Sequence, residues 1–420
     1  MNMKTKRQFF SHVGISLLAV MLTMVSCSKS DGGYEYYESS EYGYDAYGRG
    51  AGDRSYDGEG GGTGDNSQTN SQAGVVTAGE WCDLTHRDFW SMLMLGEQFS
   101  DKCDYWEFYT NNRIAVKVTD ELGNALAGVN VKLLSDGNEA NSLWEAVTDN
   151  HGLAECWLGL FQKTTDVDAT RLRVSLNGET MEGHPAVCSW DSLRQSTVVN
   201  KYVLRTSKVP NKQADIAFIV DATGSMSDEI NFLKQDLVDI INKVKSVRAG
   251  MKMRTAALFY RDEGDEYLTR HHDFTDDVIN TASFVEEQSA NGGNDYPEAV
   301  HTALERMLQN LSWDGDARTR IAFLILDAPA HHEKSVIKSL QQSIENCAKQ
   351  GIKIIPVAAS GVDKNTEFML RFFANATGGT YVFLTDDSGV GESHIQASVG
   401  DYEVEQLNNL LIRLIKNYTE

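Results

Sequence analysis

The chain has 420 residues, with 38 Lys and Arg against 60 Asp and Glu, which gives a formal net charge of −22. A chain of this charge lacks the broad basic surface of a non-specific nucleic-acid binder, so no nucleic-acid partner is expected. Hydrophobic residues make up 41% of the chain, which is enough for the cores of two or three domains. After the N-terminal segment, no apolar run approaches the roughly 20 residues of a membrane-spanning helix.

Residues 1–26 have the proportions of a signal peptide. A basic start, Lys4 to Arg7, precedes an apolar stretch from Val13 to Val25 that is too short to span a membrane. The stretch ends in Met24-Val25-Ser26-Cys27, which resembles a bacterial lipoprotein signal, although Met24 stands where Leu is usual. The resemblance implies acylation of Cys27 and a lipid-anchored, surface-exposed protein of the bacterial outer membrane. The alternative is a secretory signal with an incidental cysteine.

Residues 27–75 are predicted to form a flexible acidic linker. The stretch from Ser28 to Gly74 contains no Leu, Ile, Val, Phe, Met, Trp or Cys, but it holds 12 of the 35 Gly and 7 of the 16 Tyr. Such a segment cannot bury enough apolar surface to offset the entropy lost on ordering. The alternative is that its interleaved tyrosines form a ligand-binding tract.

The next two segments are read as an aromatic-rich helical lead-in, residues 76–112, that packs on the domain after it, and a β-sandwich, residues 113–206. In the second segment, short runs of alternating apolar and polar residues are separated by turn residues such as Asn177-Gly178. Its turns, including Asp149 to Gly152, resemble carboxypeptidase-regulatory-like and bacterial immunoglobulin-like modules. The resemblance implies a stalk or spacer without chemistry of its own.

Six cysteines are too few for a scaffold built on disulfides. An exported protein could nevertheless oxidise the four between residues 76 and 200, which allow three connectivities that the sequence does not distinguish. These four are Cys82, Cys103, Cys156 and Cys188. Cys347 shares helical spacing with apolar residues and is expected to be a buried free thiol.

Residues 213–420 alternate apolar strands with amphipathic helices, beginning with a strand at Asp215–Val220 and a helix at Ser227–Val247. This alternation predicts a doubly wound, Rossmann-like α/β sheet with helices on both faces. Pro297 is expected to open one of the later helices. The fold class is therefore multidomain, with an N-terminal β-sandwich and a C-terminal α/β domain.

Two of these predicted strands end in an aspartate, Asp221 and Asp327. Ligands of such sheets bind beyond the carboxyl ends of the strands. After Asp221, Thr223 and Ser225 follow at alternate positions, so that three oxygen-bearing side chains can turn inward. Oxygen ligands without Cys or His favour Mg²⁺ or Mn²⁺ over zinc.

The pattern Asp221-x-Thr223-x-Ser225 after an apolar strand resembles the metal-ion-dependent adhesion site of von Willebrand factor A domains. The resemblance implies that the two hydroxyls bind the metal directly and that Asp221 and Asp327 complete the site, partly through water. The family's loop threonine is absent, and Asp295, in a Gly-Gly-x-Asp-x-Pro-Glu variant of that loop, is assigned to its position. The expected cofactor is Mg²⁺, with Mn²⁺ or Ca²⁺ as alternatives.

The resemblance implies a non-enzymatic envelope protein that binds a protein partner through the metal, with the partner offering an acidic group or a carbonyl. No catalytic residue is assigned. One alternative is a metal-dependent hydrolase, for which His331 is the candidate general base. Another is an assembly subunit of an envelope complex. The paired histidines, His271-His272 and His331-His332, are expected to be solvent-exposed loop residues.

Overall fold

The computed structural model describes residues 76–420 apart from residues 164–167, 188–198, 206–210, 294–295 and 387–395. The predicted signal peptide, Cys27 and the acidic linker lie outside the described residues, as do Cys188 and Asp295. Within the described ranges, no helix is both long enough and apolar enough to cross a membrane.

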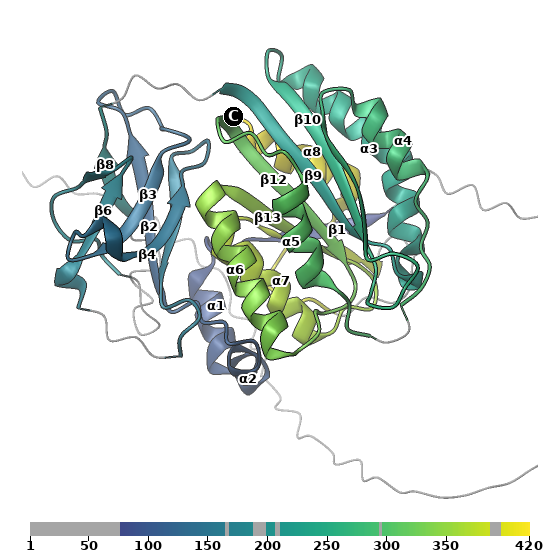
Figure 1. The fold of residues 1–420 in the computed structure, drawn as a ribbon, viewed down its shortest axis with the longest axis horizontal. Helices are drawn as coiled ribbons and strands as arrows, with labels where there is room; N and C mark the ends of the chain where they lie inside the picture. Colours follow the sequence, from purple (N-terminus) through teal and green to yellow (C-terminus); the bar gives the residue numbers. More distant parts are fainter. Residues whose placement is uncertain (1–75, 164–167, 188–198, 206–210, 294–295, 387–395) are drawn as a thin grey trace, which may run out of the picture. The chain divides into compact units, whose positions relative to one another are not determined.

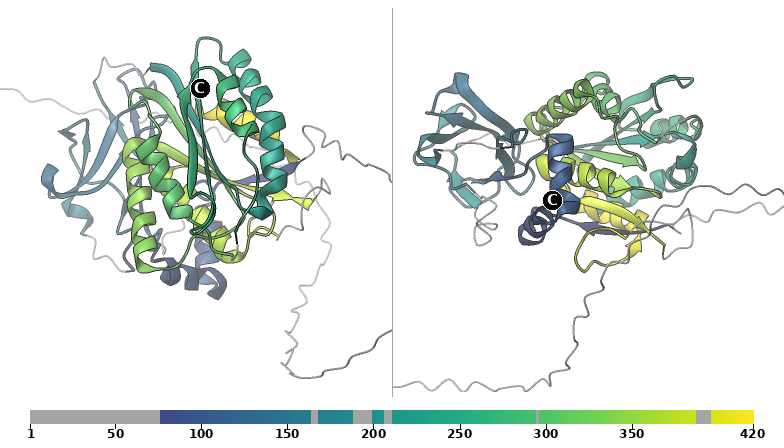
Figure 2. Two further views of the ribbon diagram at one scale, coloured as in Figure 1. Left: turned by 45° about the vertical axis from the view of Figure 1, so that its right-hand side comes forward. Right: turned by 90° about the horizontal axis from the view of Figure 1, so that it is seen from below.

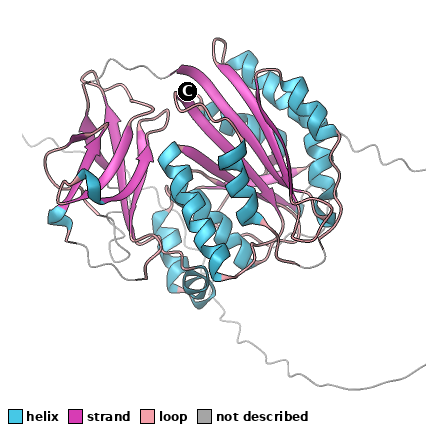
Figure 3. Ribbon diagram, in the orientation of Figure 1, coloured by secondary structure: helices cyan, strands magenta, loops and turns pink. Residues whose placement is uncertain are grey.

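Among the described residues, the C-terminal half is organised around a sheet with the strand order β11-β10-β9-β12-β13-β14-β1-β15. The strands from β10 to β14 in this order run parallel, whereas β11 and β1 are antiparallel to their neighbours (Figures 1 and 3). The strand bounds are β1 (Thr77–Trp81), β9 (Asn211–Asp221), β10 (Lys252–Tyr260), β11 (Thr269–Thr275), β12 (Ala317–Leu326), β13 (Ile352–Ala358), β14 (Tyr381–Thr385) and β15 (Glu405–Gln406).

Helices cover both faces of this sheet (Figure 2). Alternate residues of β9 face two separate cores: Phe218 packs with α3, α4 and α8, and Ile219 packs with α5, α6 and α7. Both faces of the central strands are therefore buried, as expected of a parallel sheet. The helix bounds are α3 (Ser227–Val247), α4 (Val278–Glu286), α5 (Val300–Asn310), α6 (Lys334–Gln350), α7 (Lys364–Thr377) and α8 (Leu407–Tyr418).

Helix α3 has the predicted bounds, but α5 begins at Val300 rather than at Pro297. The residues before it are held in another conformation. Glu298 forms an isolated parallel bridge with Ala330, and its N–H donates to the Pro329 carbonyl at 2.8 Å. This bridge ties the chain before α5 to the loop after β12, so the helix starts only beyond it.

The predicted lead-in, residues 76–112, is part of the α/β domain. Strand β1 pairs with β14 from Thr77 opposite Thr385 to Trp81 opposite Tyr381, so a segment far upstream of residue 213 extends the sheet. Helices α1 (Arg87–Leu95) and α2 (Glu97–Trp106) follow, and the Phe108 ring after them stacks on Phe372 of α7 at 4.1 Å between centroids. This differs from the predicted boundary between lead-in and α/β domain.

A buried ion network fastens the same segment to α7. Arg371, which is fully buried, donates to both carboxylate oxygens of Asp83 at 2.9 and 2.5 Å and to Glu367 at 3.2 Å. Its guanidinium also lies 5.0 Å from the centre of the Trp90 ring. Because every partner is supplied within the protein, the network holds the lead-in in place rather than presenting a site.

Residues 112–203 form two small sheets, ordered β5-β2-β8 and β4-β3-β6-β7 among the described residues. Inward-facing side chains of both sheets, such as Val116 and Leu133, are fully buried in one core. The strands are β2 (Asn112–Thr119), β3 (Asn130–Ser135), β4 (Ser142–Val147), β5 (Leu153–Leu158), β6 (Leu172–Leu176), β7 (Glu179–Thr180) and β8 (Val199–Val203).

Cys82, Cys103 and Cys156 are free thiols. Each of the three possible connectivities of the four cysteines needs a bridge between two of these three, so none of the connectivities is present. Cys347 is free and fully buried, as predicted.

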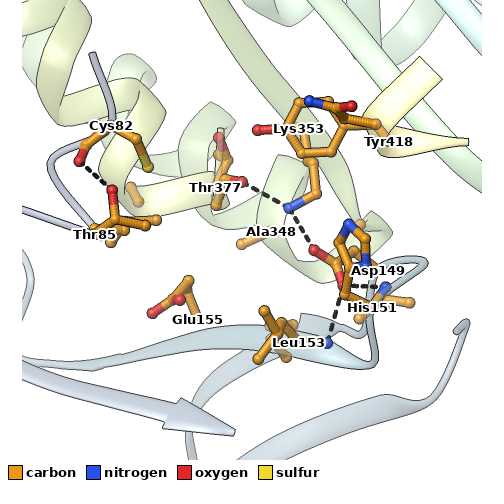
Figure 4. Close-up of a pocket in the computed structure, with 18 of the residues that line it drawn as sticks. Cys82, Thr85, Asp149, His151, Leu153, Glu155, Ala348, Lys353, Thr377 and Tyr418 are labelled. Carbon is orange, nitrogen blue, oxygen red and sulfur yellow. Dashed lines mark hydrogen bonds and ion pairs between the residues drawn. The ribbon is translucent and has the colours of Figure 1, made fainter. Parts of the chain in front are cut away.

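A cavity of about 310 Å³ lies where the two-sheet region meets the α/β domain (Figure 4). Ion pairs within its lining neutralise its charges: Lys353 Nζ lies 3.1 Å from Asp149, and Arg113 Nε lies 2.7 Å from Glu155. Lys353 also donates to the Gly378 carbonyl at 2.6 Å. The Lys353–Asp149 pair joins the two regions, and neither cation of the two pairs lacks a counter-charge.

Candidate functional site

The loop that follows β9 begins with a buried and incompletely satisfied carboxylate. Asp221 is fully buried, and its Oδ1 accepts hydrogen bonds from the Thr223 N–H at 2.8 Å and the Thr223 hydroxyl at 2.7 Å. Its Oδ2 has no hydrogen-bond partner among the described residues. Burying such an oxygen without a partner is costly, so the position favours a bound cation or donor.

Asp327 follows the neighbouring strand, and its negative charge raises the pKa of Asp221. Strands β9 and β12 are parallel, with Ile325 opposite Val220, so both aspartates stand at the same edge of the sheet. Burial, and after it the negative charge of Asp327, raise the pKa of Asp221 to about 7. Two carboxylates are therefore close enough to repel each other in the absence of a counter-charge.

Above this pair lies a cavity of about 300 Å³. Three of the predicted site residues line it: Thr223, Ser225 and Asp327. Asp221 is not among the described lining residues, but it accepts a hydrogen bond from Thr223, which is one of them. Asp295 and Cys27 lie outside the described residues. The described lining is completed by Gly224, Asp228, Glu229, Gly292, Gly293, Tyr296, Glu298, Ala328, Ser360 and Gly361.

Glu298 is a site residue to which the sequence analysis gave no role. It lines the cavity, is 3% exposed and has an Oε2 atom without a hydrogen-bond partner among the described residues. Burial first, and then Asp221 and other nearby carboxylates, raise the pKa of Glu298 to about 9. The sequence did contain a signal for Glu298, because it is the last residue of the Gly-Gly-x-Asp-x-Pro-Glu loop in which Asp295 was predicted to act.

Gly293 makes the approach of Glu298 to Thr223 possible. A Cβ atom at this residue would lie 2.8 Å from Thr223 Cβ and 2.9 Å from Glu298 Oε1, and the backbone φ of +70° favours glycine as well. Residues 292–293 therefore bring the loop's backbone against the β9 loop. The Gly224 N–H donates to the Gly292 carbonyl at 3.1 Å, which fixes the two loops together.

Two further buried groups surround the aspartates. The Tyr260 hydroxyl at the end of β10 is fully buried and has no hydrogen-bond partner in the described part of the chain. Glu229 in the first turn of α3 is 7% exposed, and burial raises its pKa to about 7. The Ser360 N–H is 3.4 Å from one of its oxygens.

The chemistry of this donor set fits a hard divalent cation. Thr223, Ser225, Glu298 and Asp327 line one cavity, and Asp221, whose Oδ2 is unpartnered among the described residues, is bonded to Thr223 of that lining. Oxygen ligands of this kind are those that Mg²⁺ prefers. No three His, Cys, Asp or Glu side chains of the described residues are arranged to hold a metal by themselves. Hydroxyl and water ligands would therefore have to take part.

His332 is an exposed loop residue, as expected, whereas the other three histidines differ from that expectation. His271 and His272 lie in β11. His331 is 21% exposed and its Nε2 lies 2.7 Å from Asp262 Oδ1, while the His332 ring stacks on Tyr105 at 3.5 Å. Neither His331 nor His332 is among the described residues that line the cavity.

A mostly parallel sheet flanked by helices, with polar loops gathered at its carboxyl edge, is the arrangement of a ligand-binding α/β domain. Residues 215–389 match the family described as von Willebrand factor A domain. This part of the chain is therefore a von Willebrand factor A domain, here called the A domain.

Two curated relatives align with parts of the chain. An ariadne-like RING finger protein of Acanthamoeba polyphaga mimivirus is 28% identical over 31% of this chain and 12% of its own length. An alpha-protein kinase of Dictyostelium discoideum is 23% identical over 49% of this chain and 32% of its own length. The chain spans less than a third of the length of either relative.

Solved structures with partial likeness include proximal thread matrix protein 1 from the mussel byssus and the pilus adhesin SpaC from Lactobacillus rhamnosus GG. The first is 15% identical, with a TM-score of 0.34 over 50% of this chain and 48% of that chain. The second is 11% identical, with a TM-score of 0.36 over 51% of this chain and 32% of that chain. At these scores neither likeness bears on function.

Proposed function

We propose that the A domain binds a protein partner through a divalent metal ion, most simply Mg²⁺, and that the protein is not an enzyme. The observation that carries the proposal is the pair of buried, unpartnered oxygens, Asp221 Oδ2 and Glu298 Oε2, beside a cavity that Asp327 also lines. Carboxylates buried in this way either hold a proton or bind a cation, and a divalent cation satisfies several of them at once. The presence of an A domain suggests protein–protein interaction or adhesion.

Within this proposal each residue has a role. The Thr223 and Ser225 hydroxyls bind the metal directly, and Asp221 and Asp327 bind it directly or through its waters. Glu298 supplies a further carboxylate from the loop in which Asp295 was predicted to act. When bound, the metal supplies an open coordination position that accepts an oxygen atom of the partner.

The hydrolase alternative has less support. It needs a general base beside the metal, and the candidate, His331, is paired with Asp262 and is not among the described residues that line the cavity. The outcome that would favour it is a measured hydrolytic activity that His331→Ala abolishes.

The N-terminal part of the proposal is a lipid anchor at Cys27, followed by a linker that holds the described domains off the outer membrane. It rests on the sequence pattern alone. Radiolabelled fatty acid should be incorporated into the wild-type protein and not into Cys27→Ser; equal labelling of both would contradict the anchor.

The partner can be sought directly with the full chain. Purified protein should capture a partner from intact cells, or from the envelope of the cells that produce it, in Mg²⁺ and release it in chelator. Asp221→Ala should capture nothing in either buffer. Capture that is unchanged by chelator and by Asp221→Ala would contradict metal-dependent binding. A partner from the producing cell's own envelope would identify an assembly subunit rather than an adhesin.

A further inference from the structure

The mouth of the A-domain cavity carries acidic side chains and no described basic one. Asp228 and Glu229 from the first turn of α3 line it together with Glu298 and Asp327, and no Lys, Arg or His belongs to the described lining. Asp228 is exposed, whereas Glu298 is 3% exposed and keeps an unpartnered oxygen in the cavity. The mouth therefore presents negative charge to an approaching partner.

Two basic side chains, Arg261 and Lys364, bond to groups outside the described lining of the cavity. Arg261 is 3% exposed and donates to the Ala222 and Ser289 carbonyls at 3.1 and 2.8 Å. Lys364 Nζ donates to Glu367 at 2.8 Å and to the Gln396 carbonyl at 2.6 Å. Neither turns a positive charge toward the mouth, so neither offsets its carboxylates.

The bound metal would not reverse this sign. A +2 ion balances two carboxylates of the site, and the exposed Asp228 at the rim adds a negative charge that the ion does not balance. A carboxylate from a partner would meet a site that is already negative, and like charges brought together at an interface oppose binding. A neutral carbonyl oxygen can take the open coordination position without that repulsion.

An aromatic ring stands at the same rim. Tyr296 is 44% exposed, and its hydroxyl accepts a hydrogen bond from the Asp363 N–H at 3.1 Å. This bond anchors the end of the ring while leaving part of the side chain open to solvent. A fixed aromatic face beside carboxylates is a favourable place for a Lys or Arg side chain.

We propose that the partner of the A domain is a basic peptide segment. A neutral carbonyl oxygen of the segment completes the coordination of the metal, and a neighbouring Lys or Arg side chain lies between Tyr296 and Asp228. This inference rests on the metal-dependent binding proposed above and narrows its partner class, since the sequence analysis left both an acidic group and a carbonyl open.

Three matched peptides test the inference on the full chain: acetyl-Gly-Lys-Asn-Lys-Gly-amide and the same peptide with Glu or with norleucine in place of both lysines. In saturating Mg²⁺, the lysine peptide should bind about tenfold more tightly than the glutamate peptide, with the norleucine peptide between them. Chelator should abolish binding of all three.

Variants at the rim locate the effect. Tyr296→Ala and Asp228→Asn should each weaken the lysine peptide by about two- to fivefold, and Tyr296→Phe, which keeps the ring, should bind it like the wild type. Asp276→Asn is the matched control, because Asp276 is an exposed carboxylate that pairs with Lys252 at the opposite edge of the sheet. It should leave peptide binding unchanged.

Calorimetric titration with Mg²⁺ alone separates the two proposals. If Mg²⁺ binds but the glutamate peptide binds as tightly as the lysine peptide, or none of the peptides binds, the basic-partner inference is overturned. If Mg²⁺ itself does not bind, the metal-dependent function is contradicted, whatever the peptides do.

Discussion

Strand β9 carries a fully buried carboxylate at each end of its apolar run, and the two differ in their hydrogen-bond partners and neighbouring charges. Asp215 accepts hydrogen bonds from Arg254 Nε at 2.9 Å and Nη2 at 2.6 Å and from the Asp314 N–H at 2.8 Å. At Asp221, Thr223 donates to one oxygen, the Tyr260 hydroxyl lies nearby and acts to lower the pKa, and burial and the charge of Asp327 raise the pKa. No Lys or Arg of the described residues pairs with it in the way that Arg254 pairs with Asp215.

This difference indicates that Asp215 stabilises the fold, whereas Asp221 is placed to bind a ligand. At Asp215 the protein supplies both the counter-charge and the donors, so the ion pair needs nothing from solvent. At Asp221 a buried oxygen is left open and another carboxylate lies nearby, which costs free energy unless something positive binds. The same strand thus provides an internal control for tests of the site.

The largest expected effect on stability comes from removing the charge of Asp215, which is paired with Arg254. Asp215→Asn leaves the Arg254 guanidinium without its counter-charge and should lower the free energy of unfolding by about 3–5 kcal/mol. In chelator at pH 8, the matched Asp221→Asn should unfold at the same or a higher urea concentration than the wild type, because it removes a repulsion. A similarly large loss of stability in both variants would mean that Asp221, like Asp215, stabilises the fold, and would contradict the comparison.

Metal binding should produce the next effect. At a Mg²⁺ concentration about 100 times its dissociation constant, the wild type should gain about 2.7 kcal/mol of stability, which chelator removes. Asp221→Asn should gain nothing, and any folded Asp215→Asn should gain as much as the wild type. Thermal unfolding of the three proteins with and without Mg²⁺ measures this, and stabilisation of Asp221→Asn would contradict the site.

The pH dependence follows from the raised pKa of Asp221, about 7, and of Glu298, about 9. The native state holds protons that the unfolded state releases, so without metal these groups destabilise the protein as pH rises from about 4 towards 9, by up to about 1.4 kcal/mol per pH unit for each. Urea unfolding in chelator should show wild type and Asp221→Asn diverging between pH 4 and 7. Parallel curves would show that Asp221 titrates normally.

Mg²⁺ binding should accordingly release protons near neutral pH and tighten as pH rises. Titrations in two buffers of different ionisation enthalpy measure the released protons. No proton release at pH 7 would contradict the raised pKa values.

The smallest expected effect is on the exposed hydroxyl of the loop. Ser225→Ala should change stability by less than about 0.5 kcal/mol, because the residue is exposed, yet it should weaken Mg²⁺ binding by about three- to tenfold. A variant of another exposed serine outside the site, Ser246→Ala, should change neither. Equal metal affinity in wild type and Ser225→Ala would remove Ser225 from the site.

The layered α/β fold could be predicted because each central strand is a continuous apolar run and each helix shows a clear apolar face, as in the Ser227–Val247 helix. The proximity of Asp221 and Asp327 at one edge also follows from the sequence, because the carboxyl ends of parallel strands meet there.

Two features could not be predicted, each for a physical reason. Strand β1 is only five residues long, so it carries too little periodicity to identify its partners, and it joins the sheet through pairing with β14, some 300 residues away. The role of Glu298 depends on its bridge to Ala330 and on the space left by Gly293, which are contacts between separate loops.

Asp221, at the end of β9, is proposed to belong to a metal site because its Oδ2 is buried and has no partner among the described residues. Calorimetric titration of Mg²⁺ into the full chain tests this proposal most directly, with Asp221→Asn beside the wild type. We expect the wild-type chain to bind one Mg²⁺ ion and Asp221→Asn to bind none under the same conditions. Absence of binding to the wild type, or the same binding to both proteins, would contradict it.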